Sequence, residues 1–487
     1  MPASAKTEWI GAAVTERLPA RQRTALYLFS AALAAAVLEG AARKWGVGSE
    51  TGLGSYLFYF SKDIAFGALL LLSPRAGESA VAERFRSWLV PGCALVLAGA
   101  LLSTWAGRMN FVGAMLSLRA LVVLPVIAWL AVRRLAGLPL RYAAMLLGGL
   151  TILNYLLSTV QNQLPPDHIL NRYVVSEAAV VAEQSGVRAT GTFSYISGLS
   201  IMSSVGVWAG LVLLSVTRSK PMTIFGGVTL LAGFGCGLAS ISRAPVIVAG
   251  LMVAGWLLLS QSARSRVLSS AGVLGVAVGA LLLTGQGSQL KRLWSGVAAR
   301  HETASDTVHE RAFGQFRELW EAAKTAPLGR GFGTEQVGGN YAVSGTMGFT
   351  NYESQFPRIV MESGILGFAG FSVVCAGALV SLRHARQAAR SAAQQDALLA
   401  TQLVLLTLFY TNVVFNHTAS AFAWMLFAAV LAAASPAGPA ASESNFGHRK
   451  KIRRRVRRSS FAAGRGDDGA GPRTGRPTPA VGHPVDI

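Results

Sequence analysis

Three arginines, Arg188, Arg243 and Arg358, lie where polar sequence meets long apolar runs. A guanidinium stays protonated at physiological pH, and its paired N–H groups can hold two phosphate oxygens at once. A group of such arginines could bind a diphosphate and stabilise the negative charge that grows on a phosphate leaving group. All three are expected at the same ends of membrane helices, so one ligand could reach them all.

Two of these arginines belong to short motifs. Arg188 opens "RATGTF", in which Gly191 and Thr192 would let the chain turn sharply into the next helix and leave N–H groups free for an anion. The alternative is that Arg188 snorkels at the membrane interface. Arg243 follows Ser242 in "SISRAP", a short turn between apolar runs, where a charge costs ~2.5–3.5 kcal/mol and needs a partner or ligand. That partner could also be a neighbouring carboxylate or carbonyl.

A hydroxyl that attacks such a diphosphate must lose its proton to a carboxylate or imidazole within hydrogen-bond reach. Glu353, in "ESQFPR", is the first candidate for this base, and a solvated loop carboxylate is the alternative interpretation. His301 and His309 compete for the same role. Glu362, four residues after Arg358, is expected to pair with that arginine on one helix face and to be mainly structural.

The candidates for substrate binding are polar residues in or near these motifs, namely Gly191, Thr192, Ser242, His301, His309, Arg330 and Gln355. Two further groups lie near the same ends of other apolar runs. Glu39, Lys62 and Asp63 are expected to pair with one another. Asn416 and His417 could contact a substrate, although a lone histidine is more often a packing residue.

No metal or other cofactor is expected. The sequence has no Asp-x-Asp motif and no His/Cys cluster. The glycines of "GRGFGT" are not preceded by a predicted strand or followed by Gly-Lys-Ser/Thr, so they do not predict a nucleotide site. The three cysteines, Cys93, Cys236 and Cys375, fall in apolar runs and are expected to pack as small apolar residues.

The elements that must position these residues are membrane helices. Apolar residues make up 52% of the chain and charged residues 14%, and the mean hydropathy is +0.44. A helix needs about 17 to 25 residues to cross a bilayer. Twelve apolar runs qualify: 25–42, 56–73, 88–106, 114–132, 140–160, 196–217, 222–240, 244–260, 267–285, 357–382, 397–415 and 418–434. The predicted fold is all-α: a polytopic transmembrane bundle of about 12 spans with a large, partly helical periplasmic loop.

The distribution of basic residues predicts the orientation. The even-numbered connections and the span ends beside them carry 13 lysines and arginines, and the first four odd-numbered connections with their adjoining span ends carry 8. The positive-inside rule therefore places both termini in the cytoplasm and the polar segment from Gly285 to Tyr352 outside. The first apolar run is long enough to stay as a span, so no cleaved signal peptide is expected.

The predicted organisation has five parts: a cytoplasmic N-terminal segment (1–24), spans 1 to 9 (25–285), a periplasmic loop (286–356), spans 10 to 12 (357–434) and a disordered basic cytoplasmic tail (435–487). Eleven of the 44 lysines and arginines lie in that tail, mostly in one basic block, which favours anionic lipid rather than nucleic acid as its partner. Within the loop, Phe313, Phe316, Trp320 and Ala323 recur at helical spacing. They predict an amphipathic helix, ended by Pro327, that lies along the bilayer or caps a cavity.

Several segments together resemble the O-antigen ligase and polymerase superfamily of bacterial membrane glycosyltransferases. They are "RATGTFSYISG", "SISRAP", "HERAFGQFRELWEAAKTAPLGRGFGTE" and "NYESQFPRIVMESGILG". Nearer the N-terminus, "EGAARKW" and "YFSKD" are similar to the subgroup associated with exopolysaccharide production. The resemblance covers roughly residues 25–434.

The resemblance implies a metal-independent enzyme that polymerises or ligates surface polysaccharide. It would transfer a glycan, with inversion, from undecaprenyl diphosphate to a sugar hydroxyl at the periplasmic face of the bacterial inner membrane. Its partners would be the undecaprenyl-diphosphate-linked oligosaccharide, a glycan acceptor, membrane lipids and polysaccharide export or chain-length proteins, with no nucleic acid. The alternative is a lipid-linked oligosaccharide flippase or other polysaccharide transporter, but transporters usually show internal repeats and helices broken at mid-membrane.

One motif departs from the family pattern. The O-antigen ligases carry a His-Asn pair eight residues before the glutamate that precedes a Gly-x-x-Gly turn. Counting back eight residues from Glu362 reaches Ser354, which Gln355 follows, so the histidine is absent. This departure puts a strict lipid A ligase activity in doubt, and it leaves Glu353 as the first candidate base with His301 and His309 as competitors.

Overall fold

The structure is a computed structural model of the 487-residue chain. It describes residues 20–46, 53–72, 79–135, 140–173, 181–182, 186–217, 219–260, 295, 314–336, 354–411 and 413–434. These residues all lie in the first of two compact units, Met1–Ala437. The second unit, Gly438–Ile487, lies outside the described residues and includes most of the predicted basic tail.

Helices make up nearly all of the described structure. The α-helices are α2 (Ala20–Ala41), α3 (Leu53–Leu72), α4 (Ala80–Ala106), α5 (Phe111–Leu118), α6 (Leu124–Val132), α7 (Leu140–Gln161), α8 (Ile196–Val216), α9 (Lys220–Ala239), α10 (Arg243–Leu259), α14 (Gln315–Thr325), α16 (Gln355–Gln387), α17 (Ala392–Thr411) and α18 (His417–Ala434). Two π-helical segments, η1 (Ala42–Gly46) and η2 (Arg119–Val123), and a 3-10 turn, η3 (Ile169–Asn171), interrupt or follow them. Two-residue strands β1 (Val181–Ala182) and β2 (Gly186–Val187) pair antiparallel in a connection.

The described residues include nine helical segments long and apolar enough to cross a membrane. One combines α5, η2 and α6, and another combines α2 with η1. These nine segments do not include α10, which is apolar but has 17 residues, or α3, which has 20 residues. The predicted all-α, polytopic fold is thus confirmed. The predicted span 267–285 lies outside the described residues, and each of the other predicted spans overlaps one of these helices.

The centre of the bundle is formed by α8 and α18. In the most apolar 18-residue stretch of each helix, 83% of the residues are buried in α8 and 78% in α18, compared with 39% in α4 and in α7. A helix that is apolar on every side and covered by its neighbours lies inside a bundle, whereas a helix with one bare apolar side faces lipid. Trp208 of α8 also donates a hydrogen bond from Nε1 to Oγ1 of Thr401 in α17, 2.9 Å away.

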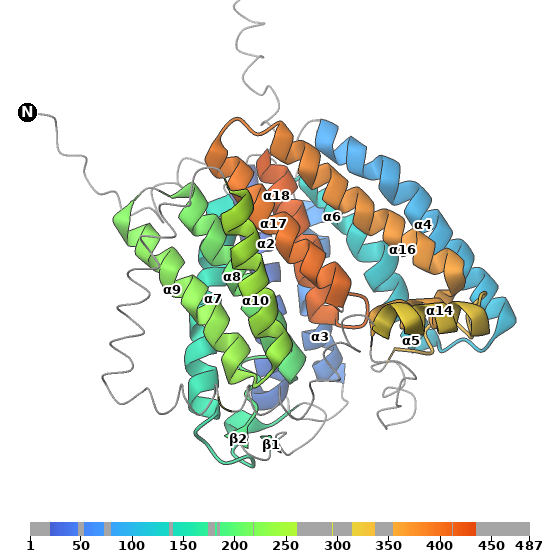
Figure 1. Ribbon diagram of the computed structural model, residues 1–487, viewed down its shortest axis with the longest axis horizontal. Helices are drawn as coiled ribbons and strands as arrows, with labels where there is room; N and C mark the ends of the chain where they lie inside the picture. The colour runs from blue at the N-terminus through green and yellow to red at the C-terminus, as the bar shows by residue number, and fades with distance from the viewer. Residues whose placement is uncertain are drawn as a thin grey trace, which may run out of the picture. The chain divides into compact units, whose positions relative to one another are not determined.

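The longest helix, α16, runs beside α4 over most of its length (Figure 1). Glycines make this close approach possible, because a Cβ on Gly99 of α4 would overlap the backbone oxygen of Ser363, and a Cβ on Gly370 of α16 would overlap the backbone oxygen of Gly92. Small residues at a helix interface serve membrane helices in this way. Within α16 the chain kinks at Gly364, whose φ of 69° favours glycine.

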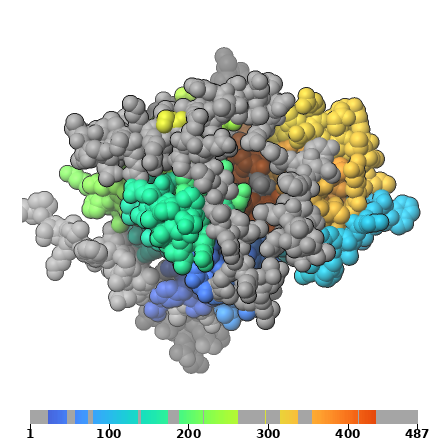
Figure 2. All heavy atoms as spheres, turned by 90° about the horizontal axis from the view of Figure 1, so that it is seen from below, coloured from blue at the N-terminus to red at the C-terminus, as the bar shows by residue number. Residues whose placement is uncertain are grey.

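The helix α14 crosses the ends of α4 and α16 instead of running along them (Figure 1). It ends at Thr325, shortly before Pro327, as predicted. Its fully buried residues are Gln315 and Ala322. Of the predicted apolar face, Ala323 is partly buried against the same small core as Ala322, whereas Phe316 and Trp320 are exposed. Phe313 lies outside the described residues. Seen from below, the residues of α14 and the turn after it (yellow) form one edge of the molecule beside the end of α4 (cyan) in Figure 2.

Candidate functional site

The backbone from Thr190 to Thr192 is held by two polar side chains of α7. Oε1 of Gln161 accepts hydrogen bonds from the N–H groups of Thr190, at 3.2 Å, and Gly191, at 2.8 Å. Oδ1 of Asn154 accepts one from the N–H of Thr192, at 2.8 Å. These N–H groups are therefore not free to meet an anion, and that part of the prediction is wrong. Gly191 is needed here because its φ is 57° and a Cβ would overlap Oδ1 of Asn154.

Two cations from η1 reach the same segment. Nζ of Lys44 donates hydrogen bonds to Oγ1 of Thr190 and to the carbonyl oxygen of Gly191, both at 2.8 Å. Nη1 of Arg43 lies 3.4 Å from Oγ of Ser194. Lys44 is buried, so these two oxygens replace part of the water that its ammonium group loses. The π-helical turn, a form often found at functional sites, brings both side chains to the segment that begins at Arg188.

A cavity of about 290 Å³ opens beside this segment. It lies where the N-terminal ends of α8 and α10 meet the C-terminal end of α17 and the turn before α18. Most of its polar lining carries hydroxyl or amide groups, and the rest of its lining is apolar. Its described polar lining residues are Arg188, Tyr195, Ser197, Ser200, Ser204, Ser242, Thr407, Thr411 and Asn416. None of the described lining residues is acidic.

Two of the candidate residues, Arg188 and Ser242, thus line the same cavity. Arg188 is anchored by its Nε, which donates a 3.1 Å hydrogen bond to the carbonyl oxygen of Ser240. Ser242 precedes α10 and makes no side-chain cap bond to it. Arg243 is the first residue of α10 and is half-buried, and the residues on both sides of it line the cavity.

The turn that carries Ser242 has a strained backbone. Ile241 has a φ of 48°, and among the described residues no other residue except glycine has a positive φ. A β-branched side chain rarely adopts this conformation, which costs on the order of 1–3 kcal/mol and persists only where the surroundings enforce it. Ile241 is fully buried, and its N–H donates to the carbonyl oxygen of Leu238 at 2.9 Å. Such strain is concentrated at functional sites.

Arg358 and Gln355 form a second polar group, on α16, and neither is among the described residues that line the cavity. The amide of Gln355 donates to the carbonyl oxygen of Phe409, and its Oε1 accepts from the N–H of Val414 at 3.3 Å. The guanidinium of Arg358 lies 3.9 Å from the centre of the Phe415 ring and donates to the carbonyl oxygen of Glu335. The expectation that one ligand reaches all three arginines is therefore not supported, although Phe415 adjoins the cavity residue Asn416.

Glu362 does not form the predicted ion pair with Arg358, although both side chains are described. Its carboxylate accepts a 2.5 Å hydrogen bond from Oγ of Ser117 and a 3.0 Å bond from the N–H of Glu335. Gln336 donates to the same Ser117 hydroxyl at 2.8 Å. Glu362 thus has a structural role, but with other partners than predicted: its carboxylate holds the turn after α14 against α5.

Arg330 lies in that glycine-rich turn, away from the cavity. Its side chain is exposed, and its N–H donates to the carbonyl oxygen of Met361 at 2.7 Å. Gly331 and Gly333, with φ of 136° and 86°, pack so closely on the loop after α4 that a Cβ on either would overlap its backbone. These glycines therefore serve a tight backbone contact.

A buried ion network joins four elements beside the segment at Arg188. The predicted pair between Lys62 and Glu39 is confirmed. Asp63 does not join that pair, because Nε and Nη2 of Arg119 hold its two oxygens at 2.8 and 2.7 Å. Nη1 of Arg119 also lies 3.1 Å from Nδ1 of His417. A guanidinium only donates, so Nδ1 accepts and Nε2 carries the proton in the neutral ring.

Comparison with known proteins gives one result that bears on this site. Residues 228–372 match the family model described as O-Antigen ligase. The resemblance to the O-antigen ligase superfamily is thereby confirmed. The matched region begins in α9, contains Arg243 and Arg358, and ends in α16, so it includes α14 and the glycine-rich turn. No curated protein matches the chain. The O-antigen ligase match associates the chain with ligation or polymerisation of polysaccharide in general.

Three residues proposed for proton transfer or substrate binding, Glu353, His301 and His309, lie outside the described residues. Of the residues that are described, no three His, Cys, Asp or Glu side chains form a group that could hold a metal ion. Cys93, Cys236 and Cys375 are buried free thiols, in agreement with the packing role expected of them.

The residues that the sequence did not reveal are Asn154 and Gln161 on α7, Lys44, and Arg119. Asn154 and Gln161 are seven residues apart, which places them on one face of the helix. Polar residues on one face of an apolar membrane helix indicate a buried polar function. That signal was present in the sequence. Arg119 carries a comparable signal, because it is a charged residue inside the predicted span 114–132, whereas Lys44 lies just outside a predicted span and carries none.

Proposed function

We propose that the chain is a membrane glycosyltransferase that polymerises or ligates a surface polysaccharide. It transfers a glycan from undecaprenyl diphosphate to a sugar hydroxyl at the periplasmic face of the inner membrane. The observation that carries the proposal is the cavity at Arg188, in which one anchored cation adjoins several hydroxyl and amide groups. Hydroxyls and amides suit a sugar, and the guanidinium suits an anionic leaving group.

The O-antigen ligase match supports the same chemistry from an independent direction, because its region supplies one wall of the cavity through Ser242 and Pro245. In this proposal Arg188 and Arg243 stabilise the diphosphate as the sugar leaves. Gln355, Gly191 and Thr192 keep the surrounding backbone in place, and Arg358 supports the turn before α18 through Phe415. Glu353 accepts the proton of the attacking hydroxyl, and His301 and His309 are the competing bases.

The test uses the full-length protein in nanodiscs with a lipid-diphosphate oligosaccharide and EDTA. Products longer than the substrate indicate a polymerase, and transfer to a separate glycan acceptor indicates a ligase. If the oligosaccharide crosses the bilayer of a liposome but stays unchanged in length and linkage, the chain is the rival transporter and the proposal is wrong. Loss of transfer in EDTA would overturn the metal-independent mechanism.

The same assay assigns the base. Glu353→Gln keeps the size and polarity of the side chain but removes its proton acceptor, so transfer is expected to fall by roughly 10² or more. Donor binding, measured separately with a labelled lipid, is expected to survive. If Glu353→Gln transfers at the wild-type rate while His301→Ala or His309→Ala does not, the base lies in the loop instead.

A further inference from the structure

The surface of α14 has three distinct faces. Its packed face carries Ala322, which lies with Ala326 against Val360 and Met361 of α16 in a small apolar core. A charged face carries Arg317, Glu321 and Lys324, all exposed. The third face carries Phe316 and Trp320, whose exposed fractions are 52% and 62%. An apolar face of this kind is costly in water and indicates an apolar partner.

The third face belongs to an aromatic patch that continues onto two membrane helices. We define the patch as Phe316, Trp320, Phe356, Phe368 and Tyr410. The ring of Phe316 lies 6.4 Å from that of Phe356 in α16. The Phe356 ring lies 5.7 Å from Phe368 and 5.9 Å from Tyr410 of α17. The helices α16 and α17 are long and apolar enough to cross a membrane. Apolar side chains left uncovered on such helices face lipid, and the apolar face of α14 is continuous with those side chains.

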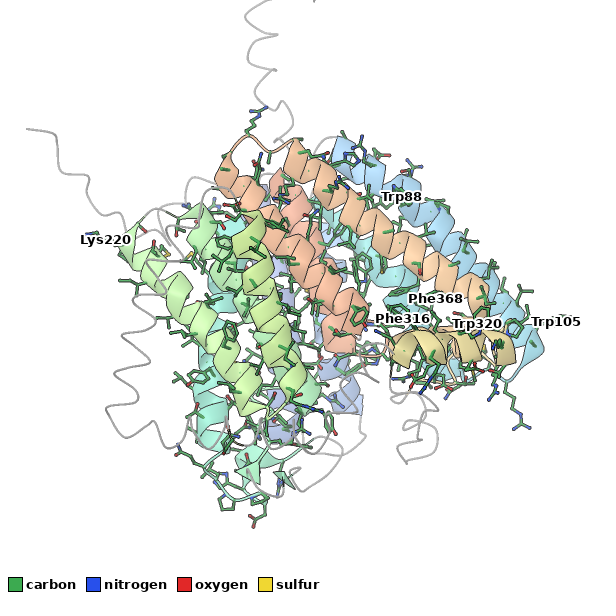
Figure 3. All side chains as sticks on the ribbon, viewed as in Figure 1. Trp88, Trp105, Lys220, Phe316, Trp320 and Phe368 are labelled. Carbon is green, nitrogen blue, oxygen red and sulfur yellow. The ribbon has the colours of Figure 1, made fainter. Side chains whose placement is uncertain are left out.

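The helix α14 lies at the end of α4 where the boundary between lipid and water is expected. Exposed tryptophans on membrane helices mark the interface with water. In α4 these are Trp88 and Trp105, and their separation of 17 residues corresponds to about 26 Å at 1.5 Å per residue, close to the thickness of the hydrocarbon core. Figure 3 shows Trp320 at the same end of α4 as Trp105. Trp320 and Trp105 thus lie at the same expected boundary between lipid and water.

We propose that α14 is an interfacial helix and that the aromatic patch is immersed in the lipid of the adjacent leaflet. Arg317 and Lys324 then reach the headgroup phosphates. Nζ of Lys324 lies 5.0 Å from the centre of the Trp320 ring, an arrangement in which the aromatic ring and the ammonium group occupy the same interfacial layer. The lipid anchor holds the glycine-rich turn that follows α14 at the membrane surface. This proposal is independent of the glycan chemistry.

The test measures which solvent surrounds each face of α14. Single cysteines replace Phe316 and Trp320 on the apolar face, Arg317 and Glu321 on the charged face, and Ala322 on the packed face. The full-length protein, with its three native cysteines replaced by alanine, is labelled with a nitroxide and reconstituted in phosphatidylglycerol-containing liposomes. Electron paramagnetic resonance then compares relaxation by oxygen, which concentrates in acyl chains, with relaxation by a water-soluble nickel chelate.

The proposal predicts that labels at 316 and 320 respond more to oxygen than to nickel, and that labels at 317 and 321 show the reverse order. The label at 322 is expected to be shielded from both and serves as the control for protein packing. If labels at 316 and 320 respond to nickel as strongly as the label at 321, the patch faces water. If they are shielded as at 322, protein covers the patch and α14 caps the bundle instead. Either result overturns the proposal.

Discussion

Replacement of Gln161 by leucine is expected to release the segment that carries Arg188. The change removes one acceptor that serves the N–H groups of Thr190 and Gly191, and no other hydrogen bond to those N–H groups is described. Each buried donor left without a partner costs about 1–3 kcal/mol, so the free energy of unfolding should fall by about 2–6 kcal/mol. The hydrogen bond from Gln161 to the carbonyl oxygen of Leu170, at 2.6 Å, is lost as well.

Gln163→Leu provides a matched control, because it makes the same chemical change two residues away at an exposed side chain. The free energy of unfolding of both variants would be measured in mixed micelles titrated with SDS. Gln161→Glu keeps the acceptor oxygen and should lie between wild type and Gln161→Leu. Equal unfolding midpoints for Gln161→Leu and Gln163→Leu would show that these bonds do not hold the segment, and the account of the site would fail.

Three further predictions concern the network, the glycine-rich turn and the orientation. Arg119→Met leaves the Asp63 carboxylate without its bidentate partner and should lower the free energy of unfolding by about 3–5 kcal/mol. The double variant with Asp63→Leu should recover part of that lost stability. A single variant as stable as the wild type would contradict the role given to this ion pair. Gly331→Ala should destabilise the protein by at least about 1–3 kcal/mol, because φ is 136° and a Cβ would overlap the Arg108 carbonyl. The control, Gly250→Ala, lies in open space within a helix and should be neutral or stabilising by about 0.5–1 kcal/mol. Equal effects of the two substitutions on the free energy of unfolding would contradict the tight contact. A cysteine at Gly338, outside the described residues, should react in intact cells with a membrane-impermeant maleimide; reaction only after the inner membrane is breached would reverse the predicted topology.

The membrane helices could be predicted from sequence because the bilayer imposes a minimum apolar length on each of them. That constraint located most ends of α2 through α10 and α16 through α18 to within five residues, but α4 begins at Ala80, eight residues before its predicted start. It did not predict the kink at Gly364 or the π-helical turns η1 and η2, because these depend on contacts with other elements. Gly364 illustrates the reason: a Cβ there would press on the backbone of Leu328, far away in sequence.

The candidate site was predictable only in part. The motifs at Arg188 and Ser242 led to two residues that do line one cavity. The side chains that hold the first motif come from α7 and η1, and sequence spacing says nothing about which helices become neighbours. The same limit explains why Glu362 was paired with Arg358: the four-residue spacing suggested a contact along one helix, but Ser117 of α5 is the actual partner of the carboxylate.

In the proposed function, the cavity at Arg188 is where a glycan is transferred from its lipid diphosphate. The most direct measurement is the initial rate of transfer by purified full-length protein in nanodiscs for Arg188→Ala, Arg188→Lys and the control Arg172→Ala, an exposed arginine that does not line the cavity. The rate should fall by about 10² to 10³ for Arg188→Ala. It should also fall for Arg188→Lys, because an ammonium group cannot reproduce a bidentate contact. Arg172→Ala should transfer at the wild-type rate; wild-type rates for both Arg188 variants, with the protein normally folded, would contradict the claim.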